Sequence, residues 1–193
     1  MDNKSNIFTK VDNDILFSKD LNDTDKALYI IIAATCKKKD GSTYFKIQTM
    51  ADRLGISRTM ANLIILKLQK QKHLIINHKC KNDNSGHMAS SDYIVFLPNK
   101  NYTICDIHLH ELIVTKKINA ATLIMYLQIK NLSEKYSNTY ICKVVNLCKK
   151  LDIHKNKFYK CIKILQENEL LTFTDFENNN DIKITRKIIK LNY

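Results

Sequence analysis

The ten residues 50–59 read MADRLGISRT, and they predict two short helices joined by a tight turn. Apolar side chains at helical spacing in the first half of this stretch indicate a helix over residues 47–54. Gly55 ends that helix, because a glycine readily takes the left-handed conformation of a helix end. Ile56 is expected to fill the corner, and Ser57 is a favourable N-cap for the next helix.

The residues on either side of this turn predict one more helix, three strands and few elaborate loops. The chain has only three glycines and one proline, which favours a largely helical structure. The predicted elements are a helix from Asn22 or Thr24 to about Cys36, a strand at 43–45, helices at 47–54 and 57–72, and strands at 74–76 and 93–96.

The second half of the chain matches the first at an offset of 97 residues without gaps, over about 60 positions. Each copy, at about 95 residues, is large enough to bury a modest core of its own. The sequence therefore predicts a domain at residues 1–98 and another at 99–193, with the boundary near the only proline, Pro98. The matching pairs are Ile15 with Leu112, Asn22 with Asn119, Tyr29 with Tyr126, Ile47 with Val144, Leu54 with Leu151, Ile56 with Ile153, Leu68 with Leu165, Gln69 with Gln166, and Leu74 with Leu171.

The second copy departs from the first at the turn. Asp152 stands in place of the glycine and His154 in place of the serine cap. Aspartate tolerates the left-handed conformation better than most residues, so we expect the turn to persist. The predicted elements of this copy are helices at 119–132, 143–151 and 155–168, and strands at 140–141, 171–176 and 182–191.

This order of helix, strand, helix, tight turn, helix and two-stranded hairpin resembles a winged helix-turn-helix. Residues 50–59 look like the turn of bacterial DNA-binding winged helices, and residues 68–75 resemble the way their third helix leads into the wing. Residues 11–76 are also similar to the N-terminal domains of plasmid replication initiators and primosome proteins of Gram-positive bacteria. The resemblance implies an α+β fold, mostly helical, with two tandem winged helix-turn-helix domains related by an internal repeat.

Composition narrows the classes of protein and of partner. The chain has 193 residues, 45% of them hydrophobic, which excludes an intrinsically disordered protein. No apolar run approaches the roughly 18–20 residues of a spanning helix, and residues 1–6 lack the layout of a signal peptide, so we expect a cytoplasmic protein without a membrane partner. A formal net charge of +12 favours a polyanionic partner, although codon bias in an AT-rich genome would also raise the lysine content.

The helix at 155–168 carries the strongest candidate site. Its core-facing residues follow the i, i+3, i+4, i+7 rule and are Phe158, Cys161, Ile162 and Leu165. The outward residues, which we expect to bind DNA, are Lys155, Asn156, Lys157, Tyr159, Lys160 and Lys163. The helix dipole disfavours a cation in the first turn by about 0.3–1 kcal/mol, so lysines there indicate a nearby phosphate backbone. A solvated lysine face is the alternative.

The corresponding helix of the first copy has a mixed outer face. Its buried stripe is expected to be Ala61, Ile64, Ile65 and Leu68. Outward lie Arg58, Thr59 and Asn62, and arginine and asparagine can pair with guanine and adenine edges.

Three further apolar residues, Met60, Leu63 and Leu66, also fall outside the buried stripe. Their equivalents at the 97-residue offset are Lys157, Lys160 and Lys163. These three residues either widen the core or form an interface with another subunit or with the other copy. If they form an interface, a homodimer through this face is the more specific prediction.

The two wings differ in charge. Lys79 and Lys81 flank the first tip, where a phosphate contact is expected. The second tip carries acidic residues that should repel DNA, so we interpret it as a spacer or a protein contact. Its acidic residues are Asp175, Glu177 and Asp181, and the basic residues nearby are Lys183, Arg186, Lys187 and Lys190.

No motif supports a metal, a cofactor or catalysis. The six cysteines contain no C-x2-C pair, and Cys105, His108 and His110 lack an evident fourth ligand. Nucleophile-elbow, phosphate-loop and zinc-protease motifs are absent from the sequence. We therefore expect neither an enzyme nor a small-molecule substrate.

The sequence thus predicts a non-catalytic protein that binds specific sites on double-stranded DNA. A mobile element is the expected context, in plasmid or phage replication, maintenance or transcription regulation, and an origin binder and an operator-binding repressor both stay open. The alternative is a protein-interaction module built on winged helices.

Overall fold

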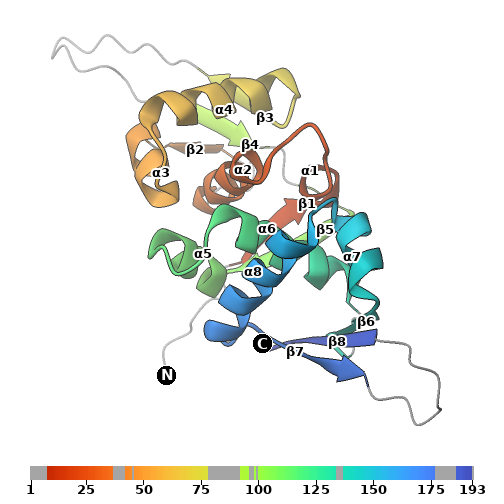
Figure 1. The fold of residues 1–193 in the computed structure, drawn as a ribbon. Helices are drawn as coiled ribbons and strands as arrows, with labels where there is room; N and C mark the ends of the chain where they lie inside the picture. The colour runs from red at the N-terminus through yellow and green to blue at the C-terminus, as the bar shows by residue number, and fades with distance from the viewer. Residues whose placement is uncertain are drawn as a thin grey trace, which may run out of the picture. The chain divides into compact units, whose positions relative to one another are not determined.

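The computed structural model of the chain describes residues 8–36, 42–44, 46–77, 92–95, 98, 100–133, 137–176 and 186–192. The contacts divide the chain into two compact units, Met1–Ala120 and Ala121–Tyr193. Both units combine helices with small antiparallel sheets, as the α+β fold class requires (Figure 1). None of the helices in the described part of the chain is long and apolar enough to cross a membrane.

The first unit holds two small sheets and five helices in its described part. Strands β2, β4 and β3 form one antiparallel sheet in that order, and β1 pairs with β5 in the other. The elements are β1 (Phe8–Asp12), α1 (Asn13–Leu16), α2 (Asp23–Thr35), β2 (Ser42–Tyr44), α3 (Ile47–Leu54), α4 (Arg58–Lys70), β3 (Leu74–Asn77), β4 (Asp92–Val95), β5 (Tyr102–Asp106) and α5 (Ile107–Val114).

Helix α2 is the centre of the first unit, because it packs against β1, α3 and α4 and is buried over most of its length. Asn22, and not Thr24, is its N-cap. The Asn22 side chain accepts from the Asp25 backbone N–H, and the Asp25 carboxylate accepts from the Asn22 backbone N–H. The same carboxylate accepts a hydrogen bond from Lys67 Nζ at 2.6 Å, which ties the start of α2 to the last turn of α4.

The second unit repeats the order of α2 to β4. One antiparallel sheet contains its strands in the order β6, β8, β7. Its elements are α6 (Ala120–Leu132), β6 (Thr139–Cys142), α7 (Val144–Leu151), α8 (Lys155–Glu167), β7 (Leu171–Phe176) and β8 (Arg186–Leu191). We call β7 and β8 the wing of this unit.

The bounds of α6, α7 and α8 are those of α2, α3 and α4 shifted by 97 residues at both ends. The equivalence that the sequence offset predicts therefore extends to three helices. That the two halves arose as copies of one unit remains a prediction.

The pairing of β1 with β5 joins the chain's start to residues beyond Pro98. The register runs from Phe8 opposite Asp106 to Asp12 opposite Tyr102. The first compact unit consequently includes β5 and α5. Neither these two elements nor β1 and α1 were among the elements predicted from the sequence. The division between residues 98 and 99 was predicted from the sequence repeat and not from contacts, and it stays a prediction.

Both tight turns adopt the expected left-handed conformation, with φ of 71° at Gly55 and 55° at Asp152. Lys116, which follows α5, donates from Nζ to the carbonyl oxygens of Asp52 at 2.8 Å and Arg53 at 3.2 Å. A Cβ at position 55 would lie 2.7 Å from that Nζ. Glycine at this position therefore suits both the backbone angle and the neighbouring amine.

Candidate nucleic-acid interface

Helix α8 separates its core and outer residues as the sequence predicts. Phe158, Cys161, Ile162 and Leu165 are buried. The six residues predicted to bind DNA are all exposed, and they are Lys155, Asn156, Lys157, Tyr159, Lys160 and Lys163. The structure thus gathers four lysines and an asparagine on the exposed surface of one helix, and DNA contact by these residues remains a prediction.

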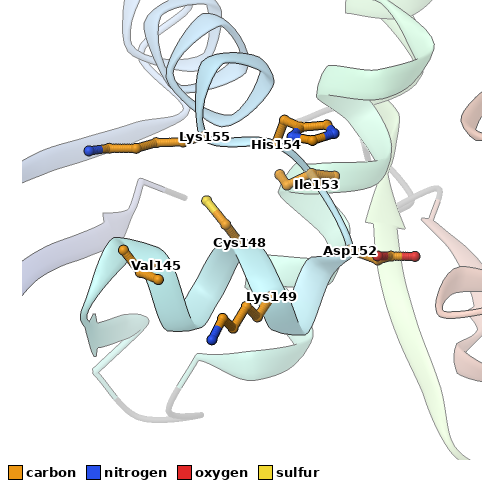
Figure 2. A pocket seen from close by; sticks show the side chains of 7 residues that line it. All are labelled: Val145, Cys148, Lys149, Asp152, Ile153, His154 and Lys155. Carbon is orange, nitrogen blue, oxygen red and sulfur yellow. The ribbon is translucent and has the colours of Figure 1, made fainter.

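The first turn of α8 differs from that of α4. Ser57 Oγ accepts from the Met60 backbone N–H at 3.1 Å, whereas His154, the N-cap of α8, makes no capping bond with its side chain. A groove of about 330 Å³ lies beside this start, and Figure 2 shows Cys148 directed from α7 toward it. The residues lining the groove are Val145, Cys148, Lys149, Asp152, Ile153, His154 and Lys155.

An aromatic cluster, which the sequence analysis missed, joins α8 to the wing. The ring of Tyr159 lies edge-on to Phe158 and to Phe173 of β7, with centroids 5.5 and 6.2 Å apart, respectively. Phe158 and Phe173 also contact each other, at 5.9 Å. The alternation of β7 already placed Phe173 on the same face as the buried Leu171, and that was the available signal.

Two lysines flank this aromatic cluster. Lys155 Nζ lies 5.8 Å from the centre of the Tyr159 ring, and Lys187 Nζ lies 5.5 Å from that of Phe173. Lys187 also pairs with Asp175. Asp175, expected from the sequence to repel DNA, is therefore partly neutralised by its neighbour across the wing. Arg186 and Lys190 are exposed, while Glu177, Asp181 and Lys183 lie outside the described residues.

Helix α4 presents an apolar outer surface. Met60, Leu63 and Leu66 are 47%, 60% and 56% exposed. These three side chains therefore do not widen the core stripe of α4. The predicted buried stripe of Ala61, Ile64, Ile65 and Leu68 is confirmed. Arg58 and Thr59 are exposed and Asn62 is half-buried, whereas Lys79 and Lys81 lie outside the described residues.

The candidate metal ligands of the first unit do not converge on one point. Cys105 is buried in β5 and His108 is exposed. His110 Nε2 lies 3.2 Å from Thr9 Oγ1, and burial lowers the pKa of His110. Over the described ranges, no group of three or more histidine, cysteine, aspartate or glutamate side chains could hold a metal ion.

The cysteines of the second unit are core residues. Cys142, Cys148 and Cys161 are buried. Burial, together with the neighbouring Cys148, raises the pKa of the Cys142 thiol to about 11, and burial also raises the pKa of Cys148. A protonated, buried thiol is a poor nucleophile and a poor metal ligand.

Comparison with known proteins agrees with this arrangement. None of the curated proteins matches the chain. Among solved structures, the Pi initiator protein, determined in complex with iteron DNA, has a similar fold, with a TM-score of 0.54 and 11% sequence identity. The match covers 98% of this chain and 97% of that one. Residues 19–74, which run from shortly before α2 to the first residue of β3, match the helix-turn-helix domain family. The resemblance to a helix-turn-helix replication initiator, predicted from the sequence, is confirmed at the level of the fold.

Proposed function

We propose that this protein binds specific sites on double-stranded DNA, without catalysis, as a replication or regulatory protein of a plasmid or phage. The observation that carries the proposal is the exposed surface of α8, with Lys155, Lys157, Lys160 and Lys163 on the third helix of a helix-turn-helix arrangement. The helix-turn-helix match and the similar fold of an initiator solved with iteron DNA support it.

Each candidate residue has a role that its chemistry suits. The lysines of α8 contact phosphates, which fix the register of the protein on DNA. Lys149, beside the groove at the start of α8, adds a further cation. Asn156 reads a base edge in the major groove. In the first unit, Arg58, Thr59 and Asn62 form a second contact surface, and Lys79 and Lys81 contact phosphates.

The proposal predicts strong salt dependence of DNA binding. Neutralising about 6–10 phosphates gives a slope of about −5 to −9 for log K against log salt concentration. The slope is measured by fluorescence anisotropy on a duplex that the protein selects from a random library. A slope near zero, or no binding at low salt, would contradict nucleic-acid binding and favour the protein-interaction module.

We also propose that the apolar outer surface of α4 binds a second copy of this chain. Lysines occupy the equivalent positions on α8, so the fold does not require Met60, Leu63 and Leu66 to be apolar. Arg58 and Lys70 are exposed at the two ends of α4. The three apolar side chains lie between these cations, and two copies, each with a net charge of +12, repel one another least where a surface is uncharged. Such a dimer would present two copies of α8 to DNA and, if symmetric, would favour an inverted repeat.

The dimer proposal predicts that Leu63→Glu produces a folded monomer, because burying an unpaired carboxylate opposes association. Sedimentation velocity measures the mass, and circular dichroism checks the fold. Val114→Glu is the matched control, since Val114 is an exposed apolar residue on α5, 42% accessible to solvent. A wild-type protein that is monomeric at all concentrations would contradict the dimer.

A further inference from the structure

The aromatic contact between α8 and the wing links the lysines of α8 to the sheet of the second unit. Tyr159 is 39% exposed, yet its ring has two aromatic neighbours, Phe158 and Phe173. Edge-to-face contacts at these separations are favourable beyond the area that they bury. The Tyr159 ring is therefore held by the protein itself.

The pattern of the wing shows where this contact lies. Along the pair β7 and β8, Leu171 is opposite Leu191, Phe173 opposite Ile189, and Asp175 opposite Lys187. Side chains two apart on a strand share a face, so these three pairs lie in a row on the side that carries the core. Phe173 and Ile189 form the middle pair, between the buried leucines and the ion pair, and Tyr159 packs on Phe173.

The first unit has no aromatic residue at the corresponding positions. Residues 97 before Tyr159 and Phe173 are Asn62 and Ile76. The aromatic contact is thus specific to the unit whose helix carries the exposed lysines. Lys155 lies over the Tyr159 ring, so the contact also fixes the surroundings of a lysine in the first turn.

We propose that Tyr159 is a positioning residue for DNA recognition, resting on the proposed function of α8. Its ring, packed on Phe173, sets the orientation of α8 relative to the wing and holds Lys155 in place, so that the lysines meet the phosphates in one geometry. The tyrosine hydroxyl is not required for this role. Pre-ordering a binding surface raises affinity by lowering the entropy that is lost on binding.

The test measures affinity for the duplex selected by the wild-type protein, using four variants whose folding is checked by thermal melting. Tyr159→Phe keeps the ring and is expected to bind within about twofold of wild type. Tyr159→Ala and Phe173→Leu each remove one side of the contact, and each is expected to weaken binding by about three- to tenfold. The double variant Tyr159→Ala/Phe173→Leu is expected to bind no more weakly than the weaker single variant.

Hydrogen exchange without DNA gives a second readout that a loss of DNA contact would not change. The backbone amides of β7 are expected to exchange faster in Tyr159→Ala than in Tyr159→Phe. Three results would each overturn the positioning role. The first is equal exchange in Tyr159→Ala and Tyr159→Phe, and the second is an equal loss of affinity in those two variants. The third is that the losses of Tyr159→Ala and Phe173→Leu add in the double variant. If the wild-type protein selects no duplex, the proposed function fails, and hydrogen exchange still decides whether Tyr159 holds the wing.

Discussion

Lys67→Ile is expected to lower the free energy of unfolding of the first unit by about 2–4 kcal/mol. Removing one partner of a fully buried ion pair costs about 3–5 kcal/mol, because the other charge is left uncompensated. The Asp25 side chain is 3% exposed, but Lys67 is 39% exposed, so water reaches this pair and the lower range applies. Urea denaturation, followed by circular dichroism, measures the change.

The second unit supplies the matched control for this prediction. The residues 97 after Asp25 and Lys67 are Thr122 and Ile164, a pair without charge. Thr122 is buried at the equivalent position of α6. The double variant Asp25→Thr/Lys67→Ile is therefore expected to recover most of the stability lost in Lys67→Ile. A double variant as unstable as the single one would show that the uncompensated charge is not the cause.

Replacing Lys155, Lys157 and Lys160 together by alanine is expected to weaken binding of the selected duplex by about two to three orders of magnitude at low salt. Each lost phosphate contact also flattens the salt slope by about 0.9. The slope of the triple variant should therefore be smaller in magnitude by about 2.7 if all three lysines contact phosphates. Anisotropy titrations over a series of salt concentrations measure both quantities.

A second triple variant with the same loss of charge distinguishes the loss of phosphate contacts from the effect of a lower net charge on affinity. Lys19, Lys100 and Lys117 are exposed and lie outside helices α3, α4, α7 and α8, so their replacement by alanine is the matched control. This control is expected to change affinity by less than about tenfold. If Arg58→Ala abolishes binding while the α8 triple variant binds like wild type, the first unit carries the DNA contact instead.

The orientations of α4 and α8 were predictable because one local rule, the spacing of apolar residues along a helix, governs them. Apolar side chains at 158, 161, 162 and 165 leave only one orientation for α8, and the same rule orients α4. The turns were predictable for a similar reason, since Gly55 and Asp152 are residue types that tolerate a positive φ. In both cases the information lies within a few residues of the feature.

The features that were missed depend on residues far apart in the sequence. Strand β1 is stabilised by β5, and Phe8 is paired with Asp106, so a local pattern reports neither partner. Lys116 at the Gly55 turn and Lys67 on Asp25 are likewise long-range contacts. The sequence does place Tyr159 on the outer side of α8. Only the fold shows that Phe173 lies beside it.

The exposed positions shared by α4 and α8 also bear on how such a protein changes over generations. Positions 60, 63 and 66 and their equivalents 157, 160 and 163 are all exposed, so substitutions there alter stability by only about 0.5 kcal/mol or less. Selection can therefore act on these side chains almost independently of folding. Three substitutions replace the lysines at 157, 160 and 163 by the apolar side chains found at 60, 63 and 66, and the chemistry of the outer helix surface changes while the scaffold beneath stays the same.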